Sequence, residues 1–384
     1  ATATDMYNVA VGHNAGREIT TGKQNTIVGG LAADAVTTGT NNVAVGYLAL
    51  STETAGDNSV AIGRSALGTQ NVTTGGNVYN VAVGHSAGGA VTTGIENTII
   101  GGLAGDALTT GVRNIAIGKS ALSADTTGRF AVAIGKDALA SQNFTTSTEN
   151  YNVAVGALAG KDVSTGIYNT FVGGLAGEDN TVGQRNVAVG LQALQQNTAS
   201  DTNIAVGVNA LRKHNLTTTG DAYNVAVGDS AGTEMTTGIY NVLIGGLAGD
   251  ALTSGNNNVA VGLHALGGDT KGDQSLAIGN DALKDQNFTT NTDVYNVAVG
   301  KSAGQSVTTG KLNTLIGAFA GDALTDADDN VALGYGALTS DTLGSRSVAI
   351  GRDALFDQNF TTATNAYNVA VGYEAGANVT TGYS

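Results

Sequence analysis

One spacing constrains the fold of this chain more than any other feature. A glycine that closes a short apolar run recurs at intervals of 17, 17, 17 and 21 residues. The first run reads Val-Ala-Val-Gly at residues 9–12, and these marker glycines continue from Gly12 to Gly372, 21 in all. Four intervals make a super-repeat of 72 residues. Such a period indicates a solenoid or related repeat architecture, in which each unit buries its apolar face by stacking on the next.

The apolar runs are short, rich in Val and Ile, and bounded by Gly, Asn and Thr, which favours strands over helices. Seventeen residues have room for two short strands and two turns, which make one coil of a β-solenoid. We therefore predict an all-β parallel β-solenoid, or β-roll, of 21 coils with lengths of 17, 17, 17 and 21 residues.

The repeat also predicts the domain organisation, because no shift in composition marks a boundary. We expect residues 1–384 to be one continuous array. Because both ends carry the same phase without a distinctive cap, we expect an excerpt of a longer fibre or a unit capped by other chains. The predicted super-repeats are 1–72, 73–144, 145–216, 217–288 and 289–360, with a partial copy at 361–384.

Composition argues against several classes of function. The chain has no Cys, which excludes disulfides and thiolate metal sites, and its net charge of -14 comes without a basic run, so we expect no nucleic-acid binding. No stretch approaches the roughly 18 apolar residues of a membrane span, so no membrane insertion is expected in this segment. The four His share no single phase of the repeat, and the carboxylates scatter over turns. We predict no catalytic site, no cofactor and no metal, and hence no enzyme.

The position four residues before the marker glycine is Asn in most coils. Stacked Asn side chains can hydrogen-bond to one another along a solenoid. We predict a structural ladder, for which a ligand site is the less favoured interpretation. The ladder runs through Asn8, Asn25, Asn42, Asn80, Asn97 and Asn114.

The strand is apolar on both faces, whereas a strand with one wet face should alternate. In the second coil of each super-repeat the middle strand residue is also large. We interpret this residue as part of an outer face that packs on identical chains around a symmetry axis; a flattened roll that covers both faces itself is the alternative. The predicted inter-chain packing residues are Ile27, Ile99, Phe171, Leu243 and Leu315.

The longest coil of each super-repeat contains an Asn-x-Thr triplet and four extra residues. Such a triplet on an exposed loop is a glycosylation acceptor in a secretory context, and a bulge there is a place for lateral contact with a sugar or partner. Ordinary turn chemistry is the alternative. The residues concerned are Asn71, Asn143, Asn215, Asn287 and Asn359.

Two stretches, NSVAIGRSAL at 58–67 and RNIAIGKSAL at 113–122, resemble the head repeats of trimeric autotransporter adhesins. The 17-residue pattern is also similar to repeat regions of bacteriophage tail-fibre proteins. The resemblance implies a left-handed β-roll, a homotrimer of chains side by side, and an extracellular location on a cell or virion surface. It implies the structural shaft of a fibre that supports or performs surface adhesion, with a host-surface receptor or glycan as a further partner.

Two other functions remain open from the sequence. One is a filament that polymerises end to end through uncapped coils. The other is a ligand-binding solenoid for ice, calcium or glycans. The Thr column that begins at Thr20 and Thr37 suggests ice binding. The segment GGLAGDAL at 101–108 suggests calcium binding, with Asp106 as a ligand. The alternative, which we favour, is that Asp106 is a solvated turn residue.

Overall fold

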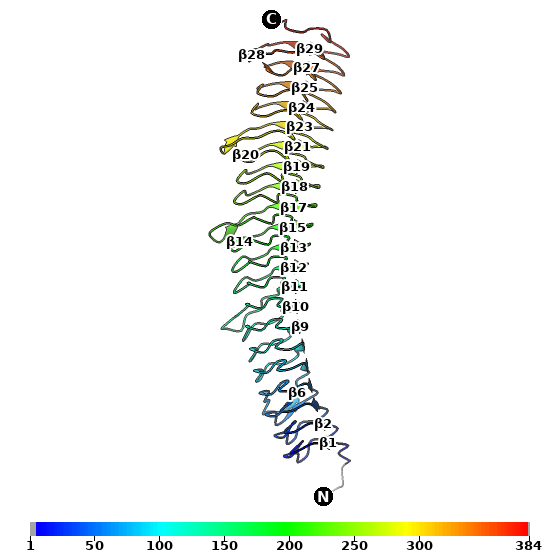
Figure 1. The fold of residues 1–384 in the computed structure, drawn as a ribbon, viewed down its shortest axis with the longest axis vertical. Helices are drawn as coiled ribbons and strands as arrows, with labels where there is room; N and C mark the ends of the chain where they lie inside the picture. Colours follow the sequence, from blue (N-terminus) through cyan, green and yellow to red (C-terminus); the bar gives the residue numbers. More distant parts are fainter. Residues whose placement is uncertain (1–4, 383–384) are drawn as a thin grey trace. The chain divides into compact units, whose positions relative to one another are not determined.

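The chain is an all-β parallel solenoid of about 21 coils (Figure 1). The structure, a computed structural model, describes residues 5–382, and no helix occurs in that range. The chain divides into two units, one ending at Asn186 and the other beginning at Val187, and each is described by itself. The coil spacing is the same in both units.

Unit 1 stacks one three-residue strand from each coil into a parallel sheet. Equivalent residues pair, so that Ala10 lies opposite Ile27, and Ile27 opposite Ala44. The strands are β1 (Val9–Val11), β2 (Thr26–Val28), β3 (Val43–Val45), β5 (Val60–Ile62), β7 (Val81–Val83), β8 (Thr98–Ile100), β9 (Ile115–Ile117), β10 (Val132–Ile134), β11 (Val153–Val155) and β12 (Thr170–Val172).

Unit 2 repeats this arrangement, again with parallel pairing between neighbours in chain order. Its three-residue strands are β13 (Val187–Val189), β15 (Ile204–Val206), β17 (Val225–Val227), β18 (Val242–Ile244), β19 (Val259–Val261), β21 (Leu276–Ile278), β23 (Val297–Val299), β24 (Thr314–Ile316), β25 (Val331–Leu333), β27 (Val348–Ile350) and β29 (Val369–Val371).

A second strand per coil, which the repeat length allows, forms only in places. Elsewhere the far side of the coil consists of turns with left-handed residues such as Asn14 (φ 55°) and Leu50 (φ 52°), a conformation that no strand adopts. Short strands pair beside the four-residue insertions, where the chain forms lateral loops. They are β4 (Gly56–Asp57), β6 (Gly76–Asn77), β14 (Ser200–Asp201), β16 (Gly220–Asp221), β20 (Gly272–Asp273), β22 (Thr292–Asp293), β26 (Gly344–Ser345) and β28 (Thr364–Asn365).

The marker glycine is required by the close stacking of the coils. Gly84 has φ +141°, and a Cβ atom on it would lie 2.6 Å from the carbonyl oxygen of Gly101 in the next coil. That separation is well inside van der Waals contact, and the backbone conformation is one that other residues rarely adopt. The period of the sequence therefore reflects a position where only glycine fits.

The middle residue of each strand points into the roll, and this corrects one prediction from the sequence. The large middle residues were expected to pack on other chains, yet each has no exposed surface within a single chain. The prediction was wrong because strand residues alternate between faces, which turns the middle one inward. The residues concerned are Ile27, Ile99, Phe171, Leu243 and Leu315.

Glycines opposite these large side chains explain how a thin roll holds them. A Cβ atom on Gly88 would lie 2.9 Å from Cδ1 of Ile99, and one on Gly177 would lie 2.5 Å from Cε1 of Phe171. The third and fourth coils of each super-repeat, whose middle residue is Ala, instead carry a buried Leu at this turn position, as at Leu50. A large middle residue thus fills the space beside the turn glycines of its own and the preceding coil, and in the other two coils a turn Leu fills the interior.

Candidate functional site, an apolar strip on the outer face of the sheet

The first and third residues of each three-residue strand form what we call the outer strip. They point away from the roll because the middle residue points into it. Ile100 keeps 37% of its surface exposed, whereas its neighbour Ile99 keeps none, and Ile115 on the next coil is 36% exposed. Register pairing places these residues in two parallel rows along each unit.

The outer strip carries no charge. Its residues are Val, Ile or Leu in almost every coil, and the exceptions are the threonines at the start of β2, β8, β12 and β24. A continuous apolar surface of this kind marks an interaction site more often than scattered apolar residues do. The outer strip is therefore the candidate functional site.

The margins of the outer strip are richer in aromatic and basic side chains. Directly after the marker glycines lie exposed Tyr47 and Tyr335, and on other coils the charged side chains of Arg64, Lys119 and Lys136. An apolar centre bordered by aromatic and Arg side chains is typical of protein–protein interfaces.

The predicted Asn residues form a ladder inside the roll, next to the strip. The Asn25 backbone N–H donates to Oδ1 of Asn8 at 2.9 Å, and the Asn25 side-chain amide donates to the Gly39 carbonyl at 2.9 Å. Asn42, Asn97 and later equivalents repeat these bonds. Asn25, Asn42, Asn80, Asn97 and Asn114 are buried, and Asn8 on the first coil is half-buried. Because each amide joins two coils, its role is structural.

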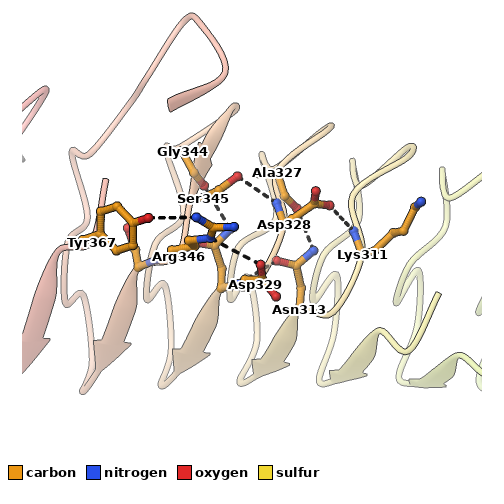
Figure 2. A network of polar contacts seen from close by, with 11 residues as sticks. Lys311, Asn313, Ala327, Asp328, Asp329, Gly344, Ser345, Arg346 and Tyr367 are labelled. Atoms are coloured by element: carbon orange, nitrogen blue, oxygen red, sulfur yellow. Dashed lines mark hydrogen bonds and ion pairs between the residues drawn. The ribbon is translucent and has the colours of Figure 1, made fainter. Parts of the chain in front are cut away.

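Figure 2 shows the same chemistry in unit 2, where two ladders run side by side. The Asn313 amide donates to the Ala327 carbonyl at 2.8 Å. Two residues earlier, the Lys311 backbone N–H donates to Oδ1 of Asp328 at 2.7 Å, and the Asp328 N–H donates to Oγ of Ser345 at 3.0 Å. Side chains thus replace backbone hydrogen bonds where the coils turn.

The Asn-x-Thr residues continue a column of threonines. The Thr20 hydroxyl donates to the Thr37 carbonyl at 3.0 Å, and the equivalent hydroxyl of Thr54 donates to Oδ1 of Asn71 at 2.8 Å. Asn143, Asn215, Asn287 and Asn359 accept in the same way, and all five are half-buried or exposed. The amide oxygen therefore has a structural role, and glycosylation stays a prediction.

The sequence reasoning missed a second set of buried polar residues, seven positions after the marker glycine. We call this the polar core column. In four of the five complete super-repeats the third coil supplies an acid and the fourth a Gln, as at Asp125 and Gln142, whose side chains bond at 2.7 Å. The signal was present, since an acid followed 17 residues later by Gln recurs at 53 and 70, 125 and 142, 269 and 286, and 341 and 358.

Metal-binding geometry is absent from residues 5–382, since no group of three or more His, Asp or Glu side chains is placed to hold an ion. Asp106, in the segment that suggested calcium, is half-buried, and burial raises the pKa of its carboxyl. It is thus less solvated than a free turn residue.

Comparison with protein-family models and with curated proteins found no match for this chain. The part of the chain that the structure describes also contains no helix long and apolar enough to cross a bilayer.

Proposed function

We propose that this chain is the non-enzymatic structural shaft of a multi-chain fibre, in which copies of the chain pack on one another through the outer strip. The partly exposed, uncharged rows of Val and Ile are the single observation that carries the proposal. A solenoid fold suits such a role, because stacked repeats make long, regular surfaces.

The occupant that best fits the outer strip is a second copy of the same chain. The strip presents an apolar pair at most rungs, and a Thr with one apolar residue at the others, with a spacing of about 4.8 Å. Another copy offers the same spacing and the same absence of charge, so the rows can interdigitate along their length. The net charge of -14 lies outside the strip and disfavours contact through the other faces.

The finer parts of the proposal rest on the resemblance described above. These are a left-handed roll, three chains per fibre, an extracellular location on a cell or virion surface, and adhesion to a receptor or glycan. Lateral contact would fall on the loops of the longest coils. One such loop, at Thr289 and Thr290, borders a shallow cleft that is also lined by Lys311, Asp326 and Asp328.

Two neighbouring residues with opposite orientations test the proposal. Ile100→Lys places a charge in the outer strip, and we expect it to weaken self-association about tenfold or more, because an unpaired charge in a dry interface is costly. Ile99→Ala enlarges the interior and should lower the stability of the coil while leaving the assembly intact. Sedimentation equilibrium of both variants, with Thr145→Lys on an exposed loop as the matched control, measures the difference.

A wild-type chain that stays monomeric over the accessible concentration range would contradict the proposal. So would an Ile100→Lys variant that assembles as the wild type does. Filaments longer than one chain that persist in Ile100→Lys would instead favour end-to-end polymerisation.

A further inference from the structure

Five residues before each marker glycine, one side chain per coil points outward beside the sheet; we call this position the rim column. Figure 2 shows three consecutive members, Asp329, Arg346 and Tyr367, in which the Arg346 guanidinium donates to the Tyr367 hydroxyl at 2.8 Å. Each member has a left-handed backbone, for instance Tyr367 with φ 55°. Side chains on adjacent coils therefore come into direct contact along this column.

In two places the rim column holds two tyrosines in succession. The rings of Tyr151 and Tyr168 stack with centroids 6.1 Å apart and planes 19° from parallel, and those of Tyr223 and Tyr240 stack at 5.9 Å and 14°. All four side chains are about half exposed, at 47% and 49% for the first pair. They can therefore meet a solvent-borne reagent while the two coils hold them together.

The first tyrosine of each pair also has a proton acceptor. The Tyr151 hydroxyl donates to Oε2 of Glu149 at 3.1 Å, and the Tyr223 hydroxyl donates to Oδ2 of Asp221 at 3.2 Å. A phenol loses an electron more readily when a neighbouring base accepts its proton at the same time. The hydrogen bond to Glu149 raises the pKa of Tyr151, so the phenol is protonated at neutral pH and this coupled route is the relevant one.

Tyrosine is the main oxidisable side chain of this protein. The sequence contains no Cys and no Trp, and only two Met. Cys and Met are the usual first targets of oxidants in proteins. Because these more reactive residues are almost absent, the exposed Tyr side chains are the main electron donors on the surface.

We propose that Tyr151–Tyr168 and Tyr223–Tyr240 are sites of oxidative cross-linking, in which a haem peroxidase with hydrogen peroxide joins the two stacked rings by a carbon–carbon bond. Each phenol gives one electron to the oxidised peroxidase and one proton to the adjacent carboxylate or to water. The two phenoxyl radicals couple at ring carbons ortho to oxygen, and the two displaced ring hydrogens move to the oxygens. In sum, two phenols lose two electrons and two protons, which reduce one hydrogen peroxide to two waters.

The consequence of the bond is a covalent tie between neighbouring coils. Each coil is otherwise held to the next by hydrogen bonds and a thin core, and a chain stacked in this way can open locally. The tie closes a loop between residues 17 positions apart, which restricts that opening. This inference concerns contacts within one chain and does not depend on the proposed assembly through the outer strip.

The test treats the full chain at low concentration with a haem peroxidase and hydrogen peroxide, followed by digestion and mass spectrometry. We expect linked peptides that are lighter by two hydrogens and pair Tyr151 with Tyr168 and Tyr223 with Tyr240. Their yield should not depend on protein concentration, and prior unfolding in urea should abolish the selectivity.

The repeats supply matched variants. Tyr168→Leu should remove the first link and leave the second unchanged. At the equivalent of Tyr168, the coil after Tyr295 carries Leu312, so Leu312→Tyr should create a third link to Tyr295. Links spread over other tyrosines such as Tyr47 and Tyr79, links only between separate chains, or an absent third link would each overturn the inference.

Discussion

Within unit 2, the polar core column is built in two different ways, and the contrast shows what such a thin roll demands of a buried polar group. One pair, Asp269 and Gln286, is fully hydrogen-bonded. Gln286 Nε2 donates to Oδ2 of Asp269 at 2.6 Å, and the backbone N–H groups of Gly272 and Phe288 donate to Oδ1 at 2.9 and 3.2 Å. The Gln286 carbonyl oxygen accepts from Asn296 at 2.9 Å.

The equivalent pair one super-repeat earlier is Asn197 and His214. His214 has no exposed surface, and neither ring nitrogen has a hydrogen-bond partner. Asn197 turns instead to its own coil, where it accepts from the Ser200 N–H at 3.0 Å and donates to the Ser200 carbonyl at 3.0 Å. His214 therefore contributes no hydrogen bond to this column, whereas Gln286 bonds to both Asp269 and Asn296.

A third position changes with the pair. A Cβ atom on Gly272 would lie 2.2 Å from Oδ2 of Asp269, so the carboxylate occupies the space that a side chain would need. The residue equivalent to Gly272 beside Asn197 is Ser200, and its hydroxyl accepts from the Leu216 N–H at 2.9 Å. In the Asp269 coil that backbone donor is satisfied by the carboxylate itself. The three residues therefore form one packing unit, and substitution of one constrains the others.

The largest effect is expected for Asp269→Ala. The change leaves Gln286 and two backbone N–H groups buried without their acceptor, and each such group costs about 1–3 kcal/mol. We expect the local free energy of opening to fall by roughly 3–5 kcal/mol on this basis. Native-state amide hydrogen exchange at Gly272 and Phe288 measures it, with Asp285→Ala on the surface as the control. Unchanged protection at those amides would refute the role assigned to the carboxylate.

The next effect is a difference in pH dependence between the two pairs. Burial lowers the pKa of His214 from 6.5 to about 4, so the folded coil keeps the ring neutral while the unfolded state takes up a proton below pH 6.5, and stability is lost as the pH falls from 6.5 toward 4. The difference between the folded and unfolded pKa values of His214 corresponds to a loss of about 3 kcal/mol of local stability once the pH has fallen to 4. Burial raises the pKa of Asp269 above 3.8, so its coil responds in the opposite sense and gains stability as the pH falls through its folded pKa.

Hydrogen exchange at pH 7 and pH 5, corrected for intrinsic rates, separates these responses. We expect protection around His214 to decrease relative to protection around Asp269. His214→Met provides the control, because Met235 fills the equivalent position one coil later without a titratable group. The same loss of protection in His214→Met would show that another group is responsible.

The contrast also shows which parts of the fold the sequence could predict. The period located every three-residue strand, because a glycine such as Gly84 leaves no space for a side chain and so recurs wherever coils stack. The orientation of Ile99 was predicted wrongly, since its partners, Gly88 and Gly105, lie on turns whose path the period does not specify. The outer strip was then assigned to the wrong strand residues, although an apolar outer face was expected.

The polar core column escaped prediction for a related reason. An acid near a turn, such as Asp125, is usually solvated, but in the folded chain its carboxylate accepts from the backbone N–H groups of Gly128 and Phe144. The periodic exchange of Asp and Gln for apolar residues was visible in the sequence. The inward orientation of these Asp and Gln side chains was not visible, because a turn can direct a side chain either into the roll or toward solvent.

The smallest effect tests whether the three positions are coupled. Gly272→Ser alone should destabilise its coil, because the new Cβ atom meets the Asp269 carboxylate. In the background of Asp269→Asn the same substitution reproduces the Asn197 and Ser200 arrangement, in which the side chain bonds within its own coil. We expect a favourable coupling energy of about 1–2 kcal/mol between the two substitutions, within the range seen for residues in contact. A double-mutant cycle read by amide exchange measures it, and strictly additive effects would mean that Ser200 and Asn197 vary independently of each other.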